Sequence, residues 1–229
     1  MSDLKISNLD DNHPYRQWLH WKIPGTQLEI EGYSRAADRT FFYLPQIKVC
    51  LDAGLSEARQ GDHIFVTHGH SDHIEDVEYL SSKPGAVLYV PREITDILRT
   101  YIESRRHLAY ADAYDPSRPR PCEIIGLNPN DEIEFGYKSL RFSVRAIDCH
   151  HSAPCLGYAF SEIRHRLRPE FETVRDAFLS RNDQKGFSNF LAGKREAGEE
   201  VKEEFAEPLF VYLGDTYISA FEEQPKIFD

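Results

Sequence analysis

The sequence has few cysteines, a deficit of positive charge and no long apolar run, and each shortage excludes a class of protein. Its four cysteines are scattered along 229 residues and form no CxxC pair, so a structural zinc site built on cysteines is not expected. The formal net charge of −11 argues against general binding of polyanions, because nucleic-acid affinity usually rests on a surplus of Lys and Arg. No stretch approaches the ~18 apolar residues that a membrane span needs.

The chain does contain the apolar residues that a packed core needs. Hydrophobic residues make up 41% of the sequence and aromatic residues 12%, which is enough for one large domain or two small ones. Residues 1–15 lack the apolar centre of a signal peptide. We therefore predict a folded, soluble protein in the reduced cytoplasm, with no membrane association.

Short β-rich stretches alternate with helical patterns over the first two thirds of the chain. Residues 26–52 are predicted to form short strands broken at Gly32 and Pro45, and Pro91 is predicted to open a helix. Other predicted strands, rich in apolar residues, are 62–68, 86–90, 139–147 and 208–213. Predicted helices, with apolar residues at helical spacing, are 72–82 and 92–107, and a proline-rich loop is predicted at 111–121. This order is typical of an α/β fold.

The segment 164–207 differs in character from the rest. It begins with the basic run RHRLRP, continues with a helical pattern at Glu170–Asp183, and then reads as turn-prone over 184–194. The acidic residues 196–207 are interpreted as a solvated helix or loop. Because its apolar pattern is short, this segment is predicted to project from the core.

Polar residues of metal-binding type follow three of the predicted strands. The stretch THGHSDH carries His68, His70, Asp72 and His73 directly after one strand. A second cluster, His150 and His151, follows the predicted strand 139–147, and Asp215 follows the predicted strand 208–213. Functional sites of α/β proteins gather beyond the carboxyl ends of strands. We therefore expect the three clusters to converge in one cleft.

Neutral imidazole and carboxylate together suit zinc, with manganese or iron also possible. His68 and His70 lie two residues apart on an extended turn, so both side chains can lean toward one ion. Asp72 and His73 open the following helix and can point toward a second ion. Two metal ions about 3.5–4 Å apart lower the pKa of a water molecule that they share. They also stabilise both the attacking and the leaving oxygen of a displacement at phosphorus or carbonyl carbon. The pattern therefore favours a hydrolytic site.

Simpler interpretations exist for several of these residues. Ser71 or Asp72 could cap the helix, although a cap requires no histidine. Asp215 and Asp52 are both placed as turn aspartates would be; the functional alternative for Asp52 is an acceptor that orients a ligand histidine. Of His150 and His151, one is expected to be a ligand.

The motifs resemble those of a known superfamily. THGHSDH looks like the signature of the metallo-β-lactamase fold. CLDAG, THGHSDHI, HSAPCLGY and LGDT, in this order between residues 27 and 216, are similar to the ribonuclease Z branch, the endonucleases that trim tRNA 3′ ends. The resemblance implies one αββα sandwich over residues 1–229, with an inserted arm at 160–207 that grips the tRNA.

The resemblance also implies a ligand set. One zinc ion would be held by His68, His70 and His151, the last chosen over His150 for its spacing to Gly157-Tyr158. The other would be held by Asp72 and His73, with Asp215 bridging the two. Asp72 would also be the catalytic general base.

Further roles follow from the same resemblance. Asp52 would be the buried acid that steadies the ligand loop. Arg164, Arg166 and Arg168, by default a solvated surface run, become candidate RNA contacts. Members of the family are usually homodimers.

The sequence departs from the family pattern at four places, one of which is that the arm lacks an obvious Gly-Pro-rich tip. Glu75-Asp76 stands where Gly-Gly is common and adds negative charge near the metals. RAADRTFFYLP replaces the loop that many bacterial enzymes use for the acceptor end. Fourteen residues follow Asp215 and include no histidine, although the family has a last ligand histidine there, which predicts that the C-terminal part is missing.

Three functions remain in competition. The first is a zinc phosphodiesterase that acts on precursor tRNA. The second is a hydrolase of the same fold for a small lactone, thioester or cyclic nucleotide. The third is a homologue without catalysis that serves as a scaffold.

Overall fold

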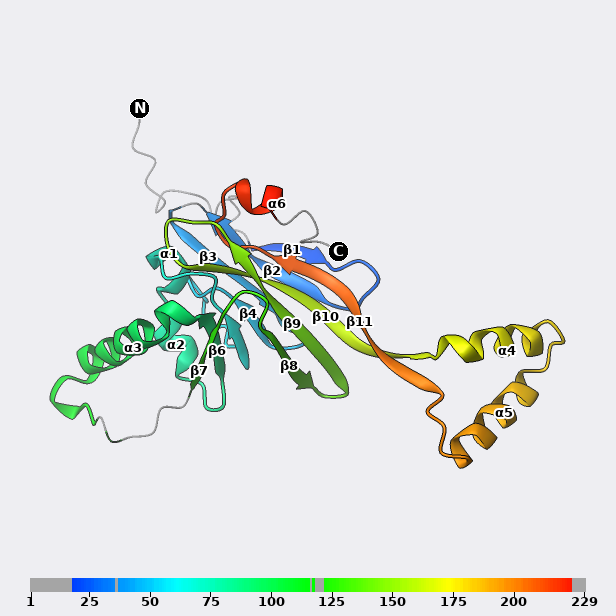
Figure 1. Cartoon of the computed structure of the whole chain (residues 1–229). Helices are drawn as coiled ribbons and strands as arrows, with labels where there is room; N and C mark the ends of the chain where they lie inside the picture. Colours follow the sequence, from blue (N-terminus) through cyan, green and yellow to red (C-terminus); the bar gives the residue numbers. More distant parts are fainter. Residues whose placement is uncertain (1–17, 36, 116, 118–121, 224–229) are drawn as a thin grey trace. The chain divides into compact units, whose positions relative to one another are not determined.

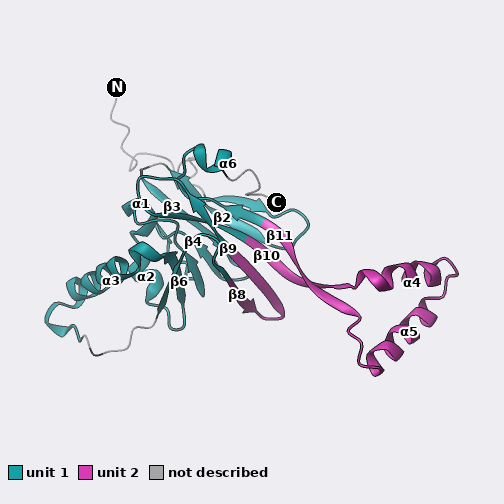
Figure 2. Cartoon of the chain, viewed as in Figure 1, with its two compact units in different colours: residues 1–132, 145–159, 210–229 teal, residues 133–144, 160–209 magenta. Residues whose placement is uncertain are grey.

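A computed structural model describes residues 18–35, 37–115, 117 and 122–223. The chain divides into two compact units (Figure 2). Unit 1 comprises residues 1–132, 145–159 and 210–229, and unit 2 comprises residues 133–144 and 160–209. Unit 2 therefore contains the predicted arm at 160–207 together with a β-hairpin segment that precedes it.

Unit 1 contains a seven-stranded sheet whose strands follow one another in chain order (Figure 1). The strands are β1 (Leu19–Lys22), β2 (Glu29–Arg35), β3 (Arg39–Leu44), β4 (Val49–Leu51), β5 (His63–Phe65), β6 (Val87–Pro91) and β7 (Glu123–Leu127). Neighbours from β1 to β4 are antiparallel, and neighbours from β4 to β7 are parallel. The carboxyl ends of β4 and β5 therefore meet at the same edge of the sheet.

Helices pack on this sheet through apolar side chains. The helical elements of unit 1 are α1 (Ser71–Ile74), α2 (Val77–Ser81), a 3-10 turn (Arg92–Ile94), α3 (Thr95–Tyr110), a second 3-10 turn (Ala111–Ala113) and α6 (Ser219–Glu223). Leu80 of α2 and Leu98 of α3 belong to the same buried cluster as Ile64 and Leu88 of the sheet. Among the described helices, none is long and apolar enough to cross a membrane.

A second, four-stranded sheet has the order β11, β10, β9, β8. Its strands are β8 (Glu132–Tyr137), β9 (Leu140–Cys149), β10 (Cys155–Leu167) and β11 (Lys202–Tyr212). Where β10 and β11 lie in unit 1, aromatic rings pack them on the first sheet. The ring of Tyr158 lies 5.1 Å from that of Phe65, and the ring of Tyr212 lies 5.7 Å from that of Phe42.

Unit 2 includes a pair of helices, α4 (Pro169–Leu179) and α5 (Gln184–Glu196). Phe178 packs against Phe187 and Phe190, with ring centroids 6.0 and 6.1 Å apart, and Phe171 packs against Phe190 at 6.2 Å. Four phenylalanines therefore form a small apolar contact between the two helices.

Two predictions for the arm are wrong. Residues 184–194, predicted as turn, form most of α5, because Asp183 caps the helix by accepting from the Gly186 amide at 2.8 Å and the phenylalanines pack against α4. Residues 202–207, predicted as solvated helix or loop, belong to β11. The exposure of these residues alternates along the strand, and Glu203 pairs with Arg166 of β10 at 2.7 Å. The segment is therefore a strand with one solvent-exposed face.

Two predicted boundaries in unit 1 also move. Strand β2 runs through Gly32 and does not break there, and a Cβ at this residue would lie 2.2 Å from the Phe41 carbonyl oxygen. Glycine is present because the neighbouring backbone approaches closely. Pro91 ends β6 and pairs in register with Leu127, so α3 begins only at Thr95. Within the predicted loop at 111–121, residues 116 and 118–121 lie outside the described residues.

Candidate metal centre

The site is built at the shared edge of β4 and β5. Asp52 directly follows β4 and adopts a left-handed backbone, φ 58°. Its amide donates to the Phe65 carbonyl at 2.8 Å, and the next amide, of Ala53, donates to the His73 carbonyl at 2.7 Å. These bonds join the turn after β4 to the last residue of β5 and to the last histidine of the motif.

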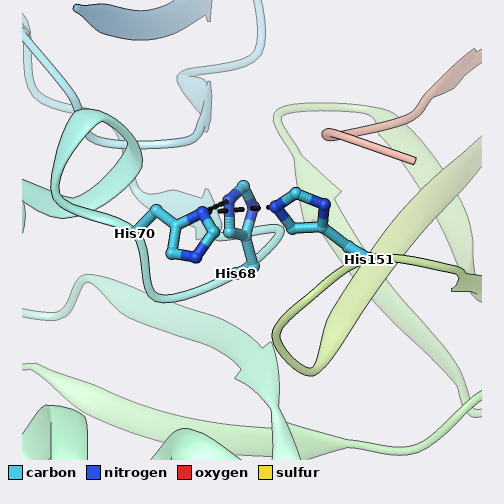
Figure 3. Close-up of side chains that lie close together, drawn as sticks. All are labelled: His68, His70 and His151. Carbon is cyan, nitrogen blue, oxygen red and sulfur yellow. Dashed lines mark hydrogen bonds between the residues drawn. The ribbon is translucent and has the colours of Figure 1, made fainter. Parts of the chain in front are cut away.

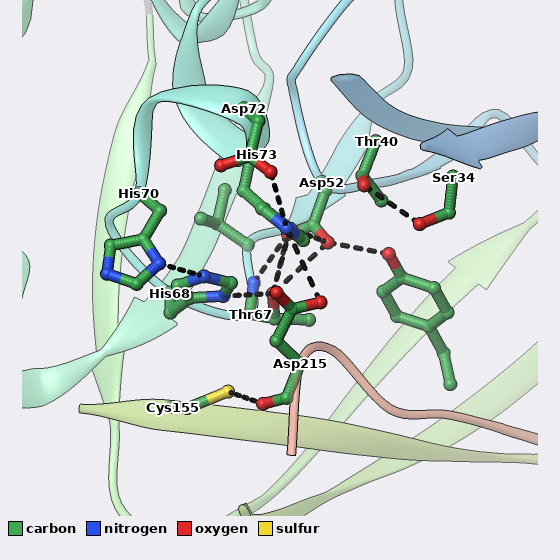
Figure 4. A network of polar contacts seen from close by, with 12 residues as sticks. Ser34, Thr40, Asp52, Thr67, His68, His70, Asp72, His73, Cys155 and Asp215 are labelled. Atoms are coloured by element: carbon green, nitrogen blue, oxygen red, sulfur yellow. Dashed lines mark hydrogen bonds and ion pairs between the residues drawn. The ribbon is translucent and has the colours of Figure 1, made fainter. Parts of the chain in front are cut away.

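The carboxylate of Asp52 is fully buried and receives four hydrogen bonds (Figure 4). Oδ1 accepts from the Thr67 amide at 2.7 Å and from the Thr67 hydroxyl at 3.0 Å. Oδ2 accepts from His73 Nδ1 at 2.8 Å and from the Tyr212 hydroxyl at 2.5 Å. A buried carboxylate needs such partners, because an unpaired buried charge is costly. Asp52 therefore holds three residues, of which Thr67 and His73 belong to the histidine motif and Tyr212 ends β11.

Thr67, which Asp52 holds in place, in turn orients the His68 ring. Its hydroxyl hydrogen goes to Asp52, so its oxygen accepts from His68 Nδ1 at 3.0 Å. This assigns the proton of His68 to Nδ1 and leaves Nε2 with a lone pair. Burial, together with the neighbouring His73, lowers the pKa of His68 to about 4. His68 is therefore neutral at neutral pH, which is the form in which an imidazole can bind a metal ion.

His73 is oriented by Asp52 itself. Burial pushes the pKa of His73 down, but the hydrogen bond and charge of Asp52, with help from Asp72 and Asp215, outweigh it and raise the pKa. The Nε2 atom is buried and has no hydrogen-bond partner among the described residues. It lies 3.7 Å from Asp72 Oδ2 and 3.8 Å from Asp215 Oδ1. A buried polar atom that faces two carboxylates in this way fits a bound cation.

A first donor group consists of His68, His70 and His151 (Figure 3). His70 Nδ1 lies 3.0 Å from His68 Nε2 and 3.2 Å from His151 Nε2, and all the ligand atoms lie within 4.8 Å of one another. A second group, His68, His73 and Asp215, meets the same limit. Four imidazoles and a carboxylate with this convergence suit zinc, and they also suit manganese or iron.

His151, and not His150, enters the first group. His150 Nδ1 lies 2.9 Å from the Ser219 hydroxyl, and its Nε2 lies 3.6 Å from Glu223. Its amide also donates to the Thr216 hydroxyl at 3.0 Å. His150 thus ties the segment after Asp215 to the loop that carries His151.

The acids that replace Gly-Gly after the motif are held by other partners. Asp76 Oδ2 accepts from the Ser56 amide at 2.7 Å and from the Ser56 hydroxyl at 2.8 Å. Glu75 pairs with Arg105 at 3.4 Å. Their charges are therefore partly compensated away from the histidines.

Two contributors to the centre were missed from the sequence. Thr67 stood in the motif, but only its bonds to Asp52 and His68 reveal its role. Tyr212 lies three residues before Asp215, and nothing in its spacing indicates a bond to Asp52. The close approach of Gly214, where a Cβ would lie 2.5 Å from the Thr67 side chain, could have been suspected from the glycine alone.

The three arginines of the basic run lie in unit 2, and each has an acidic partner. Arg164 pairs with Glu162 at 2.6 Å, Arg166 with Glu203 at 2.7 Å, and Arg168 with Glu200 at 2.8 Å. Much of the positive charge that the sequence suggested is therefore balanced locally.

Residues 44–168, more than half of the chain, match the family model described as the beta-lactamase superfamily domain. The chain belongs to this superfamily, and its pair of sheets with helices packed on the first is the metallo-β-lactamase fold that the motifs predicted. Divalent metal use goes with that membership, in agreement with the two donor groups.

Curated relatives are more distant. The chloroplastic tRNase Z TRZ2 of Arabidopsis thaliana is 23% identical over 203 residues, covering 84% of this chain and 51% of the relative. The tRNase Z TRZ1 of the same plant is 25% identical over 196 residues, covering 82% of this chain and 62% of the relative. The nuclear ribonuclease Z of Triticum aestivum is 24% identical over 158 residues, with coverages of 63% and 84%. The chain thus spans about half to three fifths of the first two.

Among solved structures, the metallo-beta-lactamase fold protein YhfI from Bacillus subtilis aligns with a TM-score of 0.35 and 14% identity. The alignment covers 57% of this chain and 53% of that chain.

Proposed function

We propose that this chain is a metal-dependent phosphodiesterase that cleaves RNA, with precursor tRNA 3′ ends as its substrate. The observation that carries the proposal is the pair of donor groups that share His68. Two adjacent sites of this kind suit displacement at phosphorus. The relatives named as tRNase Z or ribonuclease Z support RNA as the substrate class.

Zinc is the metal we propose, in two sites. His68, His70 and His151 would hold one ion, and Asp72 and His73 would hold the other, with Asp215 between them. When bound, the metals supply Lewis acidity, which lowers the pKa of water and stabilises charge on the departing oxygen.

The remaining steps belong to side chains of the protein. Asp72 is half-buried beside His73, and we propose that its carboxylate takes the proton of the attacking water. Asp52 stays hydrogen-bonded to His73 Nδ1 and keeps Nε2 directed to the ligand side.

RNA contacts are proposed for Arg164, Arg166 and Arg168. Of their glutamate partners, Glu200 is exposed, whereas Glu203 and Glu162 are partly buried. A phosphate could replace the exposed partner at low cost, because exposed ion pairs contribute about 0–1 kcal/mol. A homodimer in the cytoplasm completes the proposal, although two of the relatives are named as chloroplastic and nuclear.

A second candidate is a hydrolase for a small substrate. Residues 160–209 contain nine Lys and Arg against eleven Asp and Glu, and the basic run is paired with acids. An arm without a surplus of positive charge favours a substrate that does not need it.

The first test is metal content together with turnover. Elemental analysis of the purified protein should give about two zinc per chain, and the double variant His68→Ala, His70→Ala should lose them. The same preparations are then assayed on precursor tRNA and on bis(p-nitrophenyl) phosphate. Cleavage of the tRNA at its 3′ end supports the main proposal, and turnover of the small ester alone supports the second. Full metal content with hydrolysis of neither substrate would overturn both and favour a scaffold.

A further inference from the structure

Tyr212 connects two parts of the candidate centre that are distant in sequence. It is the last residue of β11 and lies three residues before Asp215. Its hydroxyl donates to Asp52 Oδ2 at 2.5 Å, and the same oxygen accepts from His73 Nδ1 at 2.8 Å. One carboxylate oxygen therefore holds both the strand that ends at Asp215 and the histidine that faces Asp215.

Packing alone does not account for a hydroxyl at this position. The Tyr212 ring meets the Phe42 ring edge-on, with centroids 5.7 Å apart, and phenylalanine would fill the same space. Burying a hydroxyl costs free energy unless it forms a hydrogen bond. The bond to Asp52 is therefore what tyrosine adds at this position and phenylalanine would lack.

The Tyr212 hydroxyl is also a permanent donor. Burial and the adjacent Asp52 carboxylate raise the pKa of Tyr212 well above its ordinary value. The proton therefore stays on the tyrosine oxygen throughout the range in which proteins function, and the bond does not depend on pH there.

The segment after Tyr212 is attached near the centre on both sides of Asp215. Gly214 packs tightly against Thr67, and the Asp215 carbonyl accepts from the Cys155 thiol at 3.4 Å. After Asp215, the Tyr217 amide donates to the His150 carbonyl at 2.7 Å. Of these attachments, Tyr212 is the one bonded directly to the Asp52 oxygen that also accepts from His73 Nδ1, so it links the position of Asp215, whose side chain is half-exposed, to that of His73 Nε2.

We propose that Tyr212 is a positioning residue that sets the separation of Asp215 and His73 and so selectively supports the second proposed zinc site, formed by Asp72, His73 and Asp215. This rests on the proposed function in that two zinc sites are taken to form. The first group, His68, His70 and His151, does not involve β11. Because Asp215 is proposed to lie between the two ions, loss of the hydroxyl should weaken the second site strongly and the first site, which keeps three imidazoles, only slightly.

The test compares Tyr212→Phe with Tyr158→Phe. The Tyr158 hydroxyl is fully buried and donates to the Val66 carbonyl at 2.6 Å, so the control removes a similar buried bond without touching Asp52. The full-length proteins are stripped of metal and titrated with zinc against a chromogenic chelator, and their thermal unfolding is recorded without metal.

For Tyr212→Phe we expect the second zinc equivalent to bind roughly 10- to 100-fold more weakly, the cost typical of removing a group that orients a metal ligand. The first equivalent should stay within about threefold of the wild type, by the same reasoning. Tyr158→Phe should bind both equivalents like the wild type, although both variants lose a similar part of their thermal stability.

Two results would overturn the positioning role alone. In one, Tyr212→Phe retains both affinities of a wild type that binds two zinc ions. In the other, both variants weaken both sites to the same extent, which would show a general effect on folding. A wild type that takes up no zinc would instead remove the proposed function, and the positioning role with it.

Discussion

The metal centre of unit 1 and the arm of unit 2 use the same side-chain types in opposite surroundings. At the centre, Asp52 is buried and joins three segments of the chain through four hydrogen bonds. In the arm, Asp183 is exposed and caps the helix that follows it. Removal of a buried acceptor leaves several donors without partners, whereas removal of an exposed one lets water replace it. Burial therefore decides what an aspartate contributes.

The largest expected effect tests this comparison directly. Asp52→Ala should lower the free energy of unfolding by about 3–5 kcal/mol, because it leaves His73, Thr67 and Tyr212 without their acceptor. Asp183→Ala should cost only about 1 kcal/mol, the usual value of a helix cap. Urea unfolding measures the first, and hydrogen exchange in α5 measures the second. Similar losses at the two positions would break the comparison.

Replacing two glycines by alanine should change stability by an intermediate amount, and the change should be destabilising at Gly214 and stabilising at Gly193. Gly214→Ala places a Cβ 2.5 Å from the Thr67 side chain and should destabilise the protein by about 2 kcal/mol, as overpacking does. It should also weaken zinc binding, since Thr67 orients His68. Gly193→Ala, in α5, meets nothing within 4 Å and should stabilise that helix by about 0.5–1 kcal/mol. Thermal unfolding, zinc titration and hydrogen exchange would show both, and a destabilising Gly193→Ala would contradict this account of the arm.

The smallest effect on stability is expected at the basic run. Replacing Arg164, Arg166 and Arg168 together by glutamine breaks ion pairs that are exposed or partly exposed. Such pairs contribute about 0–1 kcal/mol each, and the metal content should not change. Cleavage of precursor tRNA should fall several-fold and depend less on salt, whereas a small phosphodiester should be cleaved as before.

The matched control neutralises three other cations of unit 2, by Arg175→Gln, Arg181→Gln and Arg195→Gln. It changes the net charge equally, so an equal loss of tRNA cleavage in the control would show that the basic run has no specific role. An equal loss on both substrates would end the arm proposal.

The sequence predicted the parts of this molecule that depend on short spacing. His68, His70 and His73 stand in one motif after one strand, so their convergence needed only the strand and the turn. His151 and Asp215 were expected to join them because the carboxyl ends of strands meet, and the structure places them there.

Other features depend on contacts that spacing does not encode. The helix α5 contains two glycines and reads as turn, but its phenylalanines find partners on α4, and tertiary packing overrides the local preference. The partners of Glu75 and Asp76 come from residues up to 30 positions away, and the bond from Tyr212 to Asp52 spans 160 positions.

The left-handed backbone of Asp52 limits which amino acids this position tolerates. At φ 58°, glycine, asparagine and aspartate are accommodated with the least strain. Glycine offers no acceptor, and asparagine would turn an amide N–H₂ toward groups that are themselves donors. Aspartate therefore satisfies both the backbone and the neighbouring donors, so residue 52 should tolerate substitution far less than the exposed positions of the arm.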